Sequence, residues 1–189
     1  TITAKPQTIT YGESISNTTN DITVEGLVTN HSVTAITLTP STSAYTTNGK
    51  ITPSAATVKV GNTTVTSNYS ISWVDGTLKI NKKSVAVTWT NTTLTYNNAN
   101  QKPTASATGV TGETINLTVS GEKKDVGSNY SATVTCASVT GGGKDCNNYT
   151  LTNTSTTFKI NAYNINTTKV TIASIPDQTY TGSKIEPTL

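Results

Sequence analysis

Few side chains in this protein could do chemistry. The 189 residues include two cysteines, Cys136 and Cys146, a single histidine, His31, and ten carboxylates. Two cysteines supply only half of the four ligands of a structural zinc ion, and His31 lies far from them in the sequence. A Ser-His-Asp triad could be composed from the chain, but no serine carries a nucleophile motif. We therefore predict no catalytic, cofactor-binding or metal-binding residue, and no enzyme.

The isolated polar candidates have simpler explanations. His31 lies between Asn30 and Ser32, which favour turns, and is predicted to be an exposed turn residue. No Asp-x-Asp-x-Asp-Gly calcium loop is present. Asp145 lies close to Asn147 and could bind a cation, but we favour a solvated loop.

The two cysteines are predicted to form a disulfide. Nine residues separate Cys136 from Cys146, and they include the run Gly141-Gly142-Gly143. A glycine-rich loop lets its two ends approach, with Cys136 ending one strand and Cys146 preceding the next. The alternative is a pair of reduced thiols. A disulfide implies an oxidising, extracellular location.

Composition excludes several classes of protein. Only 12% of the residues are charged, whereas 44 are threonine, 19 asparagine and 18 serine. The chain has no arginine and a net charge of +3, without the clustered basic residues of a nucleic-acid-binding protein. No apolar run approaches the roughly 18 residues that a membrane helix needs. We expect neither nucleic-acid binding nor membrane insertion.

The elements that carry these residues are predicted to be strands. Valine, isoleucine, threonine and tyrosine favour a pleated surface, and the small net charge argues against disorder. Apolar residues alternate with polar or small ones at a period of two, the pattern of a half-buried strand. The alternating apolar sets are Val85, Val87 and Trp89; Ile115, Leu117 and Val119; and Ala132, Val134 and Cys136.

The sequence repeats internally. Asn68-Tyr69-Ser70-Ile71 returns as Asn148-Tyr149-Thr150-Leu151, and Thr77-Leu78-Lys79-Ile80-Asn81 returns as Thr157-Phe158-Lys159-Ile160-Asn161. A tyrosine near the start of each repeat recurs at Tyr11, Tyr96 and Tyr180. We predict a first repeat over 1–81, a second over 82–161, and a linker with the opening strands of a third, incomplete repeat over 162–189.

The repeat ends predict how the chain is joined. The closing segments of both repeats are predicted to be hairpins, the first turning at Asp75-Gly76. Lys82 and Lys83 form a linker short enough to restrict bending. The second junction, residues 162–168, is longer and polar. We expect it to bend more than the first unless Tyr163 and Ile165 pack on the second repeat. Residues 162–189 cannot bury a face of their own, so they are disordered, docked on a neighbour, or paired with another chain by strand addition.

These motifs resemble the MBG-type and YDG-type Ig-like repeats of large bacterial surface adhesins. The resemblance rests on Thr10-Tyr11-Gly12, on Gly109-Val110-Thr111-Gly112-Glu113, on Asp125 to Tyr130, and on the closing Asn-Tyr segments. The first repeat departs from the pattern, with Asn30-His31 where a glycine and an acid are usual. The resemblance covers essentially the whole chain and implies tandem Ig-like β-sandwiches in an elongated rod.

The predicted fold class is therefore all-β. The alternative is a β-grasp-like repeat with one short helix. The resemblance also suggests intramolecular Lys–Asn isopeptide bonds. Lys5 and Asn81 are the candidate pair in the first repeat. The simpler interpretation, which we favour, is that the lysines are surface residues. Trp73 and Trp89 are expected to pack in the core or between repeats rather than to stack on sugars.

Two functions follow from these features. The first is a structural stalk or spacer of a bacterial cell-surface adhesin, which projects a distal binding region. The alternative is a module that binds host glycans or glycoproteins through loops of the second repeat. The second repeat alone has the cysteine loop and the pair Lys123-Lys124. The sequence identifies no ligand-binding residue for this alternative.

Overall fold

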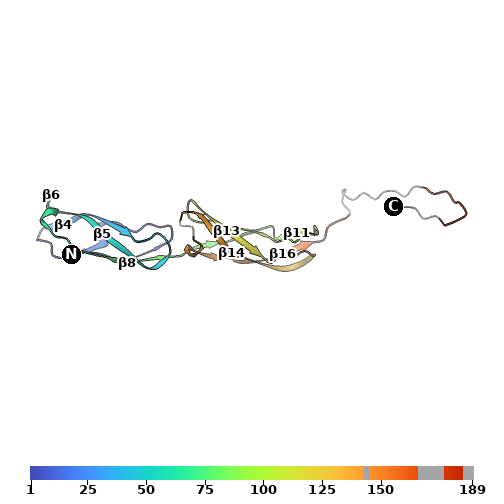
Figure 1. The fold of residues 1–189 in the computed structure, drawn as a ribbon, viewed down its shortest axis with the longest axis horizontal. Helices are drawn as coiled ribbons and strands as arrows, with labels where there is room; N and C mark the ends of the chain where they lie inside the picture. The colour runs from blue at the N-terminus through green and yellow to red at the C-terminus, as the bar shows by residue number, and fades with distance from the viewer. Residues whose placement is uncertain (143–144, 166–176, 185–189) are drawn as a thin grey trace.

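The protein is almost entirely β-structure. The computed structural model describes residues 1–142, 145–165 and 177–184 (Figure 1). The described part contains strands and three single-turn 3₁₀ helices, η1 (Thr19–Asp21), η2 (Thr66–Asn68) and η3 (Cys146–Asn148). The all-β prediction is confirmed, whereas the helix that the β-grasp alternative requires is not found in this part of the chain.

Residues 1–81, here called the first segment, form two sheets. One sheet has the strand order β3-β1-β7, and the other has the order β2-β8-β5-β4, with β6 paired to β5. The strands are β1 (Ile2–Ala4), β2 (Gln7–Thr10), β3 (Ile22–Val24), β4 (His31–Pro40), β5 (Thr46–Val60), β6 (Thr63–Thr64), β7 (Trp73–Val74) and β8 (Gly76–Asn81).

Residues 83–161, the second segment, form three sheets. Their orders are β11-β16-β14-β13, β10-β12 and β15-β9. The strands are β9 (Lys83–Ala86), β10 (Thr88–Thr90), β11 (Thr93–Thr95), β12 (Thr104–Ser106), β13 (Glu113–Ser120), β14 (Gly127–Gly141), β15 (Tyr149–Thr152) and β16 (Ser155–Asn161). Among these named strands, none of the second segment pairs with one of the first.

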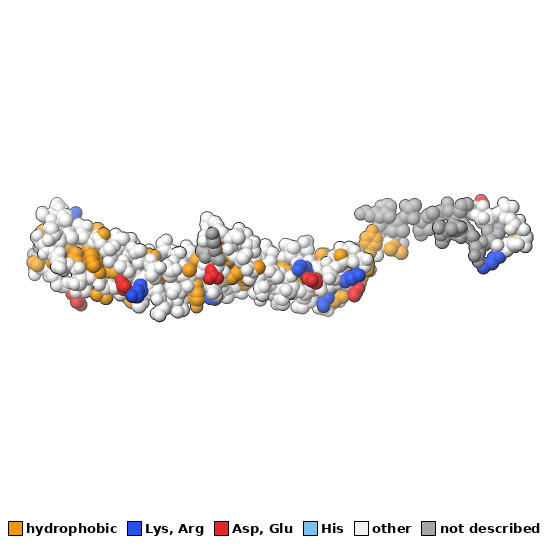
Figure 2. Space-filling view, in the orientation of Figure 1, with side chains coloured by type: hydrophobic (Ala, Val, Ile, Leu, Met, Phe, Trp, Pro, Cys, Tyr) orange, Lys and Arg blue, Asp and Glu red, His pale blue; other side chains and the backbone are white. Residues whose placement is uncertain are grey.

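The predicted alternation of apolar and polar residues builds the cores. In β8, Leu78 and Ile80 are buried while Thr77 and Lys79 face solvent. Such alternation places one face of each strand inward and leaves threonine and other polar residues outside. Figure 2 shows one face of the molecule, where a few charged side chains, some in adjacent pairs of opposite charge, and hydrophobic patches lie among the white atoms of other side chains and the backbone.

The predicted closing hairpins are wrong. β7 pairs in parallel with β1, whereas β8 pairs with β2 and β5, so the chain changes sheets at Asp75. Gly76 serves this crossing rather than a tight turn, because a Cβ atom there would lie 2.6 Å from the carbonyl oxygen of Ala4. The second segment does the same, with β15 paired to β9 and β16 paired to β11 and β14.

Other details of the cysteine region differ from the prediction. Cys136 lies inside β14, which continues to Gly141, rather than at the end of a strand. Cys146 begins η3, and the following strand begins only at Tyr149. Gly143 of the predicted glycine loop lies outside the described residues.

The third predicted region contributes no strand where it is described. Residues 177–184 are without strand assignment, and the remaining residues in which its opening strands were predicted lie largely outside the described ranges. Tyr163 and Ile165 are exposed, so they do not make the packing on the second segment that would stiffen this junction. Tyr180 is 81% exposed, in contrast to Tyr11 at 4%.

Candidate functional site at the junction of the two segments

Tyr11 lies at the centre of the contact between the two segments. It follows β2, and its backbone N–H donates to the carbonyl of Asn81 at 2.8 Å. Its ring meets that of Tyr149 edge-on, with 5.4 Å between the centroids and 81° between the planes. Its hydroxyl donates a hydrogen bond to the carboxylate of Glu113. A tyrosine of the first segment is thus inserted between two residues of the second.

The Glu113 carboxylate connects both tyrosines. The hydroxyl of Tyr149 donates to its second oxygen, Oε2, at 2.6 Å, and itself accepts the N–H of Val110 at 3.0 Å. Burial, followed by the hydrogen bond to Glu113, raises the pKa of the Tyr149 hydroxyl above its usual range. The hydroxyl therefore keeps its proton through neutral pH and remains a donor to the carboxylate.

Glycines allow the chain to pass close to Glu113. Gly112 has a φ of 84° in the turn that ends with the N–H of Glu113 donating to the carbonyl of Val110. At Gly142 a Cβ atom would lie 2.5 Å from Oε1 of Glu113, and at Gly141 it would lie 1.9 Å from the carbonyl oxygen of Gly112. These described glycines of the cysteine loop are needed because the loop packs against the turn that carries Glu113.

A second group of contacts surrounds the connecting residue Lys82. β8 ends at Asn81 and β9 begins at Lys83, so the connection is one residue shorter than predicted. The Lys82 ammonium lies 4.8 Å from the ring centroid of Tyr45 and 3.4 Å from Oδ1 of Asn147. The backbone N–H of Tyr45 donates to Oδ1 of Asn148 at 2.8 Å. Tyr45 of the first segment and Lys82 of the connection therefore both bond to η3 of the second segment.

The predicted disulfide between Cys136 and Cys146 is formed, with Cα atoms 5.9 Å apart. It ties β14 to η3, the turn that carries Asn147 and Asn148. Asp145 caps this turn by accepting the N–H of Asn147 at 2.8 Å, which is a structural role. Both cysteines pack against the hydrophobic cluster that contains Tyr11 and Tyr149. The disulfide thus supports the second segment's side of the junction.

Asn148 is the buried polar residue of this junction, with 1% of its surface exposed. Its Oδ1 atom accepts the Tyr45 N–H, whereas its Nδ2 atom has no hydrogen-bond partner among the described residues. Burying an unpaired amide is unfavourable, so the bond from Tyr45 and the packing around Asn148 have to offset that cost.

The remaining predicted residues lie elsewhere. His31 closes a turn on the carbonyl of Val28, as predicted, but it also begins β4 and is partly buried against Tyr69 rather than exposed. Trp73 is 41% exposed, so its predicted burial in the core or between repeats is wrong. Trp89 is partly buried on the cluster of Phe158 and Ile160, as expected. The Lys5 ammonium donates to the carbonyl of Asn20 at 2.7 Å, and not to Asn81.

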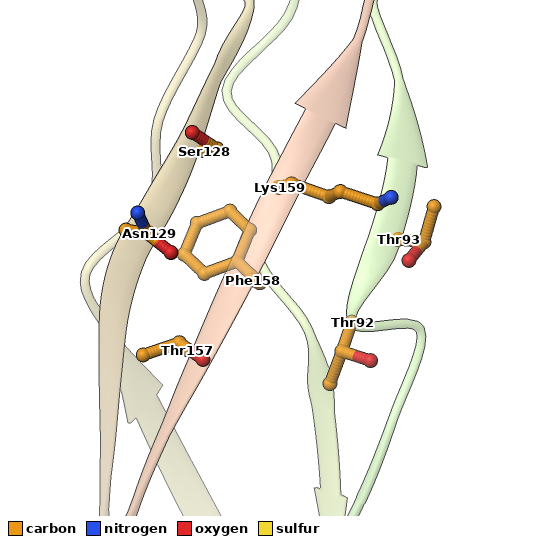
Figure 3. Close-up of a pocket in the computed structure, with 7 residues that line it drawn as sticks. All are labelled: Thr92, Thr93, Ser128, Asn129, Thr157, Phe158 and Lys159. Atoms are coloured by element: carbon orange, nitrogen blue, oxygen red, sulfur yellow. The ribbon is translucent and has the colours of Figure 1, made fainter.

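A depression of about 180 Å³ is lined by three stretches of the second segment, residues 92–93, 128–129 and 157–159, among them Phe158 and Lys159 (Figure 3). Threonine, serine and asparagine side chains make up the rest of its lining. In the described part of the chain, no cluster of three potential metal ligands occurs, and no helix is long and apolar enough to cross a membrane.

Comparisons with known proteins give no match. No family model matches the chain, and neither a curated protein nor a solved structure is found to be similar to it. The junction therefore has to be interpreted from its own geometry.

Sequence reasoning identified the Tyr11 position but missed its partners. The sequence places Glu113 in a turn motif without a role, identifies Lys82 only as part of the linker, and does not mark Tyr45. The signal for Glu113 is its place after Gly112, directly where a second-segment strand begins. No local pattern marks Tyr45, since its contact with Asn148 joins residues 103 positions apart.

Proposed function

We propose that this chain is part of a structural stalk or spacer of a bacterial cell-surface adhesin. Its task is to hold successive β-sandwich repeats in a fixed end-to-end arrangement that projects a distal binding region. The junction carries this proposal: a connection of one residue, Lys82, is flanked by contacts of Tyr11 and Tyr45 with the second segment. A spacer can hold a distal region in a fixed position only if the junctions between its repeats resist bending.

The pairing of the strands supports a tandem repeat. In the first segment the sheet β2-β8-β5-β4 joins one parallel pair to two antiparallel ones, and β11-β16-β14-β13 has the same sequence of pairings. The antiparallel pair of β1 and β3 corresponds to that of β10 and β12. The parallel pair of β1 and β7 corresponds to that of β9 and β15.

The extracellular, cell-surface location rests on two supports. The disulfide is of the kind that persists in oxidising compartments. The resemblance of the repeat motifs to MBG-type and YDG-type adhesin repeats is the second. Neighbouring repeats of the same polypeptide are the partners that this function requires, and residues 162–189 would begin the next one.

The position of the disulfide favours the spacer over the binding module. The cysteine loop was the asymmetric feature that suggested host glycan or glycoprotein binding. Its two cysteines pack on the junction cluster, and its described glycines, Gly141 and Gly142, pack on the turn that carries Glu113. The feature is thus accounted for by a role in joining the segments.

A distance measurement across the junction tests the spacer proposal. Spin labels at Lys79→Cys and Thr118→Cys, both exposed positions on strands of different segments, report how the segments move. A rigid joint gives one narrow distance distribution, which Tyr11→Ser broadens. A broad distribution in the otherwise unchanged chain would refute a stiff spacer.

A binding screen distinguishes the two functions. The oxidised chain and a reduced, alkylated sample are tested against glycans and mucin glycoproteins. The spacer proposal expects no saturable binding by either sample. Saturable binding that is lost on reduction would replace it with recognition near the cysteine loop.

A further inference from the structure

The opening strands of the first segment lie beside its closing strands. β1 pairs in parallel with β7, and β2 pairs in parallel with β8. Ile2 is opposite Trp73 in one sheet, and the same sequence separation relates the opposed residues of β2 and β8 in the other sheet. Residues 2–10, here called the opening run, and residues 73–81, the closing run, therefore point in one direction and keep one register across both sheets.

The second segment has the same arrangement. β9 pairs in parallel with β15 and β11 with β16, again with one sequence separation in both pairs. Backbone hydrogen bonds continue these ladders past the ends of the strands. The N–H of Val87 donates to the carbonyl of Thr152 at 3.0 Å, and the N–H of Tyr96 donates to that of Asn161 at 2.9 Å. Both segments thus join their first strands to their last ones.

The parallel direction puts the two ends of a segment at opposite ends of the ladders. The N–H of Ile2 donates to the carbonyl of Ser72 at 2.8 Å, so the chain enters the first segment where the closing run begins. It leaves at Asn81, which accepts the N–H of Tyr11 at the other end. The N-terminus accordingly lies on the side of the first segment that faces away from the second (Figure 1). A pull on both ends drives the two runs past each other in opposite directions.

This direction of pull loads the hydrogen bonds of a ladder together. The bonds of a parallel pair are evenly spaced and extend from one strand to the other, so a force along the strands is shared among them. A pull on two neighbouring ends would instead break the bonds one after another from that end. The chain between the two runs, residues 11–72, carries no tension until the ladders break.

Buried side chains protect one face of each ladder from water. Leu78 and Ile80 of the closing run are each 1% exposed, and Ile9 of the opening run packs against the same hydrophobic cluster. In the second segment, Ile160 of β16 is 1% exposed, and Leu94 of β11 packs against its cluster. The packing of both runs therefore has to be disrupted together with their hydrogen bonds.

We propose that this chain bears tensile load, with each segment held closed by the shear resistance between its opening and closing strands. The load leaves the first segment through β8, passes Lys82 and enters the second segment at β9. This inference goes beyond the spacer proposal, because it concerns extension along the chain rather than bending at the junction.

Pulling the full-length chain in two directions tests the proposal. One DNA handle is attached at Thr1→Cys. The other is attached at Lys79→Cys, toward the far end of the β2–β8 ladder, or at Ser72→Cys, beside the entry of the chain. All three positions are exposed, and mass spectrometry verifies that the Cys136–Cys146 bond is intact. Optical tweezers at one loading rate should give a several-fold higher unfolding force with the handle at position 79 than at position 72.

Urea unfolding of the two chains is the control. Both carry substitutions at exposed positions only, so their free energies of unfolding should be equal. Forced unfolding is governed by the unfolding rate, so unequal forces at equal stability report the direction of pull. Equal forces in the two directions, or a lower force with the handle at position 79, would overturn the inference. The junction lies outside both pulled paths, so this result would leave the spacer proposal to its own distance measurement.

Discussion

At the scale of single residues, the junction depends on a carboxylate shared by two phenols. Glu113 accepts from Tyr11 and Tyr149, which come from different segments. Hydrogen bonds to a charged group contribute about 1.5–3 kcal/mol, more than those between neutral groups. The bond from Tyr11 thus couples the segments in addition to ring packing, and the bond from Tyr149 holds the carboxylate in place within the second segment.

This coupling is measurable in a double-mutant cycle. Tyr11→Phe and Glu113→Gln should each lower the free energy of unfolding by about 1–3 kcal/mol, because a charge-assisted hydrogen bond is lost. The double variant should lose less than the sum, since both changes remove the same bond. Urea unfolding measures all three. Tyr163→Phe, at an exposed tyrosine, is the matched control and should change nothing. Strict additivity would contradict the shared bond.

A second residue-scale feature is Asp21, which predicts acid sensitivity. Hydrogen bonds from Ser16 and Thr18 hold the pKa of Asp21 below its usual value. A carboxyl with a lowered folded-state pKa stabilises the protein above its unfolded pKa, near 4, and loses that contribution as the pH falls through the folded value. The melting temperature should therefore decrease as the pH is lowered below about 4. The decrease should be smaller in Asp21→Asn, with Asp177→Asn as the control. Equal pH profiles in all three chains would contradict this role.

At the scale of elements, short turns rather than strands position the site. Glu113 follows a turn, Asn148 belongs to η3, and the disulfide anchors η3 to β14. Closing a loop of this length stabilises the folded state by about 3 kcal/mol in the chain-entropy model. The same bond limits how far Asn148 can move from Tyr45.

Reduction of the disulfide should therefore loosen the junction as well as the loop. In the reduced, alkylated chain, or with Cys136→Ser and Cys146→Ser together, the backbone amide of Tyr45 should exchange with solvent deuterium faster. Its acceptor, Asn148, is then held by fewer constraints. Amides of β1, which lies in the other sheet of the first segment, should be unchanged and serve as the control. Equal protection of Tyr45 before and after reduction would separate the disulfide from the junction.

At the scale of the whole molecule, packing continues from one segment into the next. Buried residues of both segments, including Ile80 and Val85, belong to one hydrophobic cluster. Because Lys82 is the whole connection between β8 and β9, the segments have little freedom to move apart without disrupting this cluster. We therefore expect the described segments to unfold together rather than independently.

An insertion at the connection tests this coupling. Gly-Gly-Ser placed after Lys82 should uncouple the segments, because a flexible linker lets Tyr11 leave Glu113 and Tyr149. Calorimetry should then show two transitions in place of one. The same insertion after Ala162, where the neighbouring Tyr163 and Ile165 are exposed, is the control and should leave a single transition. A single, unshifted transition after insertion at Lys82 would show that the junction contributes no cooperativity.

The sequence by itself determined the all-β class, the burial of alternating residues such as Val85 and Val87, and the disulfide. These follow from local periodicity and from the reach of a ten-residue separation. Only the tertiary structure decided which strands pair and what surrounds Tyr11. Local turn chemistry at Asp75-Gly76 suggested a hairpin, but the long-range parallel pairing of β7 with β1 separates β7 from β8. The bonds of Tyr11 to Glu113 and of Tyr45 to Asn148 join residues about a hundred positions apart, and no short-range pattern encodes such a contact.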